Sequence, residues 1–120
     1  MGIDNPFSVA EVIAYTKALG ADKKSDVDVY AKGKLSSVKF TYSAEYGTAT
    51  YNISDDGNPG TEFTVYGSYY YDGKKWTEGG RQIAVGDEVI VCGKVIDYKG
   101  TTPEFSNKEN WLVSLNGHTN

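Results

Sequence analysis

The sequence predicts an all-β fold, a small barrel of five strands preceded by one N-terminal amphipathic α-helix. Apolar residues recur at helical spacing only before Gly20, and beyond residue 27 the apolar period changes to two. The chain also carries 14 glycines and 10 tyrosines, a composition typical of many turns and half-buried strands. A length of 120 residues suits one domain. We expect residues 1–26 to form the helix and a connector, residues 27–117 the barrel, and residues 118–120 a tail.

The helix is predicted by a capping box and one apolar face. Ser8 and Glu11 have the spacing at which each side chain accepts a hydrogen bond from the backbone amide of the other. The following apolar-face positions fall on one side of a helix: Val9, Val12, Ile13, Thr16 and Leu19. Gly20 supplies the residue that ends it, and a polar connector follows.

Alternating apolar residues predict the five strands, over residues 29–36, 48–54, 62–71, 88–98 and 111–115. Turn residues separate them, and residues 73–86 form a connecting loop with room for one helical turn. Gly33 and Gly93 lie midway along the first and fourth strands. We interpret them as bend glycines, because a strand that coils tightly between two sheets favours a residue without Cβ.

Five segments form a recognisable pattern: residues 30–35 (YAKGKL), 50–57 (TYNISDDG), 85–95 (VGDEVIVCGKV), 101–105 (TTPEF) and 114–117 (SLNG). Together they resemble a bacterial OB-fold (oligonucleotide/oligosaccharide-binding) family of the kind found in exported proteins of gut anaerobes. The resemblance implies a Greek-key barrel that binds ligands across strands two and three, between the loops joining strands 1–2 and 4–5. The helix that such barrels carry between strands three and four is weak here, so the N-terminal helix can cap the barrel instead.

Mapping that face onto the sequence gives a set of candidate binding residues. The outward strand positions are Tyr30, Lys32, Lys34, Thr48, Thr50, Asn52, Thr64 and Tyr66. The 1–2 loop, residues 37–46, contributes Lys39, Phe40, Tyr42 and Tyr46, and the 4–5 loop contributes Tyr98, Lys99, Phe105 and Lys108. Single-stranded nucleic acid needs flat rings for its bases and cations for its phosphates. The predicted ligand-binding residues are therefore Tyr30, Lys32, Lys34, Thr50, Asn52 and Tyr66, with Trp76 and Lys99 at the margin.

These residues leave two functions open. The leading hypothesis is a non-catalytic module that binds single-stranded nucleic acid weakly. The alternative is an exported module that contacts protein or oligosaccharide, consistent with the sequence pI of 4.9. Tyrosine, threonine and lysine also occur on half-exposed strands that bind nothing. Trp76 has two readings as well, an exposed ring beside Lys74, Lys75 and Arg81 or a plug for one end of the barrel.

Other function classes find little support in the sequence. A net charge of −4 argues against tight, sequence-blind binding of polyanions, although a local basic patch can still act. Cys92 and His118 are the only cysteine and histidine, so the sequence predicts neither a disulfide nor a zinc site, and no other metal or cofactor. No catalytic motif occurs, and no enzymatic activity is expected. We expect no membrane-spanning segment and no signal peptide. The sequence does not determine the cellular compartment, and one interpretation is that the chain is the mature part of an exported protein.

Overall fold

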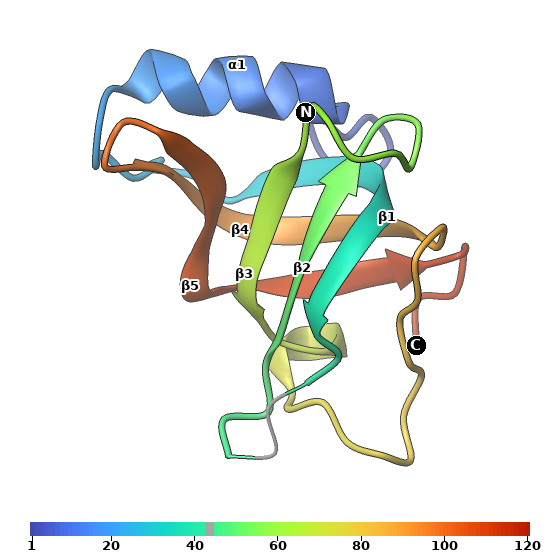
Figure 1. Cartoon of the computed structure of the whole chain (residues 1–120). Coiled ribbons are helices and arrows are strands. Elements are labelled where there is room, and N and C mark those ends of the chain that lie inside the picture. The colour runs from blue at the N-terminus through green and yellow to red at the C-terminus, as the bar shows by residue number, and fades with distance from the viewer. Residues whose placement is uncertain (43–44) are drawn as a thin grey trace.

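The computed structural model describes residues 1–42 and 45–120, and it shows a closed five-stranded barrel with one N-terminal helix (Figure 1). The predicted fold class, an all-β barrel preceded by a helix, is therefore confirmed. The elements are α1 (Val9–Leu19), β1 (Val29–Phe40), β2 (Ala49–Ser54), β3 (Phe63–Ser68), the single 3-10 turn η1 (Tyr71–Gly73), β4 (Glu88–Tyr98) and β5 (Thr102–Leu115). The predicted 1–2 loop includes Ser43 and Ala44, which lie outside the described residues.

The barrel closes in the order β1-β2-β3-β5-β4, and β4 returns to β1. All neighbouring strands are antiparallel except β3 and β5, which run parallel. β1 closes the barrel because its first half pairs with β4 and its second half pairs with β2. Gly33 lies where β1 changes partner, and a Cβ there would come within 2.7 Å of Val9 on α1. Glycine is thus needed at this position for close packing.

α1 covers one end of the barrel and contacts all five strands (Figure 1). The predicted capping box is present, with Ser8 Oγ accepting from the Glu11 amide at 3.1 Å and Glu11 Oε1 accepting from the Ser8 amide at 2.9 Å. Val9, Val12 and Thr16 are buried beneath the helix, as its apolar face predicts. The N-terminal helix therefore supplies a cap that the β3–β4 connection does not.

The β3–β4 connection plugs the opposite end of the barrel, where η1 lies (Figure 1). Trp76 is 2% exposed, and its Nε1 donates to the Ser68 carbonyl at 2.9 Å. Tyr71 and Ile83 are buried in the same core, and the Tyr70 ring packs edge-on against the indole. Of the two readings of Trp76, the plug is the one found. Its prediction as an exposed ligand-binding ring is wrong, because the ring fills the barrel end.

Three strand boundaries differ from the predicted ones by more than one residue. β1 continues through Phe40 and β5 begins at Thr102, so much of the two predicted loops is strand. Phe105, expected in the 4–5 loop, is fully buried and packs edge-on against Phe63. β3 ends at Ser68, before the run of three tyrosines. The longer β1 and β5 extend the side wall of the barrel on which the candidate site lies.

Candidate functional site

The exposed aromatic rings gather on one side wall of the barrel. Phe40, Tyr46, Tyr66 and Tyr98 are 54%, 50%, 44% and 41% exposed, and no other aromatic ring in the described part of the chain is as open to solvent. All of them line two adjoining hollows of about 480 and about 490 Å³. The two hollows share Phe40, Thr50 and Tyr66, so they form one surface, which we call the aromatic groove.

Strand alternation and local irregularities position these rings. Tyr66 points outward from β3 because its neighbour Val65 is buried in the core. Phe40 pairs with Thr50 at the end of β1, just after a register shift. Such bulges reorient side chains at the rim of a barrel. The side chain of Thr50 is already used within the fold, since its Oγ1 accepts from the Gly67 amide at 3.0 Å.

Gly67 allows β5 to approach β3 beside the groove. Its φ of +54° is left-handed, and a Cβ at this position would lie 1.8 Å from Asn107 Oδ1. Asn107 and Lys108 both line the groove next to Gly67. A residue with a side chain at Gly67 would push this part of β5 away.

Three lysines border the groove. The Lys108 ammonium lies 4.3 Å from the centre of the Tyr46 ring, and the Lys99 ammonium lies 5.3 Å from that of Tyr98. Lys39 lines the hollow near Phe40. Within residues 1–42 and 45–120, none of the three lysines is in an ion pair. Their charges are therefore available to an anionic ligand.

Glu104 supplies the carboxylate of the groove, and no other acidic side chain of the described residues lines it. It is only 7% exposed, and burial raises the pKa of its carboxyl from 4.5 to about 7. It makes no hydrogen bond or ion pair with any residue that the structure describes. The Glu104 oxygens are not among the fully buried polar atoms, so the carboxylate keeps part of its contact with water, but no donor of the described residues replaces the water that burial removes, and its charged form is disfavoured.

A row of polar side chains crosses the outer face toward Glu104. The register places Ser37 beside Asn52, Asn52 beside Thr64, and Thr64 beside Glu104. Asn52 Nδ2 donates to Ser37 Oγ at 2.9 Å, and Thr64 Oγ1 donates to Asn52 Oδ1 at 2.8 Å. These bonds fix the orientation of the Asn52 amide at the floor of the groove.

The structure separates the predicted binding residues into groups. Thr50, Asn52 and Tyr66 line the aromatic groove, and Lys99 lies beside it next to Tyr98. Lys32 and Lys34 line a different hollow, next to the start of α1. The outward positions in the first part of β1 therefore do not form one continuous platform with those of β3, whereas Phe40 at the end of β1 does share the groove with Tyr66.

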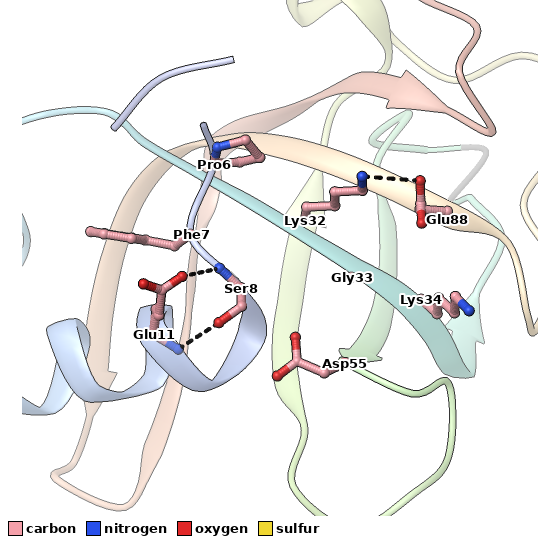
Figure 2. Close-up of a pocket in the computed structure, with 9 residues that line it drawn as sticks. All are labelled: Pro6, Phe7, Ser8, Glu11, Lys32, Gly33, Lys34, Asp55 and Glu88. Atoms are coloured by element: carbon pink, nitrogen blue, oxygen red, sulfur yellow. Dashed lines mark hydrogen bonds and ion pairs between the residues drawn. The ribbon is translucent and has the colours of Figure 1, made fainter. Parts of the chain in front are cut away.

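Figure 2 shows this second hollow, between the start of α1 and β1. The Lys32 ammonium lies 3.5 Å from a Glu88 carboxylate oxygen. The two oxygens of Asp55 accept from the Val9 and Ala10 amides at 2.8 and 3.1 Å. Asp55 thus occupies the positive end of the helix, where an anionic ligand would otherwise bind.

Tyr30 lies in neither hollow. It is half-buried and pairs with Cys92 across β1 and β4. Cys92 is 1% exposed, and burial raises the pKa of its thiol to about 11. The thiol is therefore protonated at neutral pH and poorly suited to act as a nucleophile.

Glu104 and Asn107 are among the groove residues that the sequence did not indicate, together with Tyr51, Gly67 and Thr102. Residues 102–110 include a proline, Pro103, and polar side chains at most other positions, so their strand character is weak in the sequence. The useful signal was Phe105. If Phe105 is a core residue, strand alternation places Glu104 on the outer face beside strand three.

No protein-family model matches the chain, and no curated protein matches it significantly. Among the described residues, no cluster of three or more His, Cys, Asp or Glu side chains is suited to hold a metal ion. The helix that the structure describes is too short and too polar to cross a bilayer.

Proposed function

We propose that the protein is a non-catalytic binding module for single-stranded nucleic acid, which it holds in the aromatic groove. The observation that supports this most is the gathering of Phe40, Tyr46, Tyr66 and Tyr98, the most exposed rings of the described chain, in one groove. Bases stack on such rings with about 1–3 kcal/mol per base.

The lysines around the groove supply the second requirement. Lys39, Lys99 and Lys108 surround the rings, and none of them is neutralised by an ion pair with a described residue. Phosphates between stacked bases are the anions that such cations attract. A local patch of this kind acts on a strand in the groove even though the whole chain carries a net charge of −4.

The resemblance to OB-fold proteins supports the same proposal, because the groove lies over β2 and β3, near the ends of β1 and β4. This is the face on which such barrels bind oligonucleotides and oligosaccharides. Exposed tyrosines also stack on sugars, so oligosaccharides belong in the test as the competing ligand.

Titration with short single-stranded oligonucleotides at low salt tests the proposal, with tyrosine fluorescence as the signal. Binding should quench the fluorescence and weaken as salt rises. The double variant Lys39→Ala/Lys108→Ala should bind more weakly. For this variant, the slope of log affinity against log salt concentration should decrease in magnitude by about 1.4, since each phosphate contact contributes roughly 0.7 on a single strand.

Lys32→Ala/Lys34→Ala is the matched control, because it removes the same charge from the second hollow. It should bind like the unchanged protein. An equal loss of oligonucleotide affinity in both double variants would show only a general effect of charge. A loss of affinity in the control alone would place the site in the second hollow, between β1 and α1. Binding of oligosaccharides without binding of oligonucleotides would show that the proposed ligand is wrong.

A further inference from the structure

Glu104 is an acceptor that the fold leaves without a donor. The row of polar side chains on the outer face runs from Ser37 through Asn52 and Thr64 to Glu104. The hydroxyl of Thr64 has one hydrogen, and it is donated to Asn52. Thr64 therefore has no proton left for the neighbouring carboxylate, although its side chain lies beside Glu104.

Two exposed tyrosines flank this carboxylate along β5. In the parallel pair, β3 advances from Thr64 beside Glu104 toward Tyr66, in the direction of Ser106. In the antiparallel pair, β4 advances from Ile96 beside Glu104 to Tyr98 beside Thr102. Tyr66 and Tyr98 thus lie on opposite sides of Glu104, two positions away along the strands. Diagonal neighbours at this separation lie within reach of an aromatic side chain.

We propose that Glu104 makes the aromatic groove selective for guanine. This inference rests on the proposed binding of single-stranded nucleic acid. A base stacked on Tyr66 or Tyr98 turns an edge toward the groove floor, where the Glu104 carboxylate lies. The pairing edge of guanine presents two adjacent N–H donors, from N1 and the 2-amino group, and a carboxylate accepts both at once.

The other bases fit this carboxylate less well. Adenine and cytosine each place a ring-nitrogen acceptor beside their amino group, and thymine flanks its single N–H with two carbonyl oxygens. Each of these edges sets an acceptor against the negative charge of Glu104. A good two-bond contact is worth about 1–3 kcal/mol of discrimination, or roughly 5- to 150-fold in affinity.

The guanine preference should depend on pH, because only the ionised carboxylate accepts two hydrogen bonds. The protonated form donates through its own hydroxyl and matches the donor–acceptor edges of adenine and cytosine instead. Burial raises the pKa of Glu104 to about 7, so the preference should be larger at about pH 8 than at about pH 6. Charged and titratable side chains also lie on the elements around Glu104. They include Lys39 of β1, Tyr51 of β2, Glu62 before β3, Tyr66 of β3, Lys94, Asp97 and Tyr98 of β4, Lys99 of the following turn, and the ion pair of Lys24 and Glu109.

The test uses oligothymidylates of roughly ten nucleotides that carry one central guanine, adenine or hypoxanthine. Adenine controls for the stronger stacking of a purine, and hypoxanthine keeps the N1 donor but lacks the 2-amino group. The unchanged protein should bind the guanine strand roughly 5- to 150-fold more tightly than the adenine strand at about pH 8, with hypoxanthine between them. At about pH 6 this preference should shrink.

Glu104→Gln should lose the guanine preference and its pH dependence while still binding plain oligothymidylate. An unchanged preference in this variant, or equal binding of the guanine and adenine strands by the unchanged protein, would overturn the role of Glu104 and leave the proposed function intact. Failure to bind plain oligothymidylate would instead overturn the proposed function, and the selectivity with it. A Tyr66→Ala variant checks that binding occurs in the groove, since it should weaken binding of every strand.

Discussion

Replacing Glu104 with glutamine should stabilise the ligand-free protein at neutral pH. Glu104 as a residue is 7% exposed, and burial raises the pKa of its carboxyl from 4.5 to about 7. A carboxyl whose pKa is higher in the folded than in the unfolded state binds more protons when folded between those two values. Stability therefore falls as pH rises from about 4.5 to about 7, and the loss is complete above that range.

The size of this effect follows from the difference between the two pKa values. Each pKa unit corresponds to about 1.4 kcal/mol, so the shift sets an upper limit of about 3 kcal/mol on the cost of the charged Glu104, and solvent in the open groove reduces this cost to roughly 1–2 kcal/mol. For a chain of 120 residues, 1 kcal/mol changes the melting temperature by about 4 °C. The advantage of Glu104→Gln over the unchanged protein should thus grow by about 4–8 °C between about pH 4 and about pH 8.

Thermal unfolding, followed by circular dichroism across this pH range, measures the difference. Only the pH-dependent part of the difference in melting temperature is used. The glutamine amide also changes the packing of the groove floor, and that contribution does not depend on pH. Glu109→Gln is a control of opposite sign, since hydrogen bonds from Lys24 and Ser106 lower the pKa of Glu109. That variant should be less stable than the unchanged protein at neutral pH, and the deficit should fade as pH falls. A Glu104→Gln difference that stays constant from acid to alkaline pH would refute the reasoning.

Three further substitutions test how the barrel is closed, each by chemical denaturation. Asp55→Ala removes an acceptor for the first two amides of α1 and should lower the free energy of unfolding by about 1–3 kcal/mol; an unchanged midpoint would mean that water replaces the carboxylate at no loss. Gly67→Ala should destabilise by about 1–3 kcal/mol, because φ is +54° and the new Cβ meets Asn107. Adding Asn107→Ala should recover part of that loss, and no recovery would assign all of it to the backbone. Trp76→Phe leaves a buried carbonyl without its donor and should cost about 1–3 kcal/mol, whereas a neutral result would contradict its role as a hydrogen-bonded plug.

The sequence predicted those parts of the fold that depend on near neighbours. The capping box needs only Ser8 and Glu11, three residues apart, and both of its hydrogen bonds form. The alternation in β4 likewise depends on consecutive side chains facing opposite sides, and the expected bounds, residues 88–98, agree with the strand as found. Such local patterns are readable because no long-range contact has to be known to interpret them.

The extent of β5 was harder to predict, because its first part depends on pairing partners that are remote in sequence. Its register with β4 shifts beside Gly93, and Lys108 has a φ of +62°, so simple alternation fails between Phe105 and Trp111. A Cβ at Gly93 would lie 2.3 Å from the Glu109 carbonyl oxygen. The sequence predicts Gly93 as a bend residue, and the structure shows that Gly93 also makes room for the backbone of β5.

The position of the site could be predicted only in part, for a related reason. Outward residues of one strand share a surface only while the strand keeps the same partners. β1 changes partner from β4 to β2 at Gly33 and Lys34, so Lys32 and Phe40 lie on different parts of the barrel wall. The outward position of Tyr66 on the short strand β3 can be predicted without knowing which strands pair. It follows from strand alternation, because the neighbouring Val65 is a core residue.

Packing accounts for both ends of the barrel but not for the groove between them. α1 seals one end and Trp76 the other, and their buried side chains contribute to a common core. The rings around Tyr66 contribute little to that core, because they are exposed, and exposed apolar groups that cluster are typical of binding surfaces. Whereas the exposed rings add little to stability, Glu104 lowers it, since its unpartnered carboxylate opposes folding at neutral pH. A residue that lowers stability while facing exposed rings is best explained by a ligand, and the same substitution, Glu104→Gln, should therefore raise the melting temperature and abolish the selectivity.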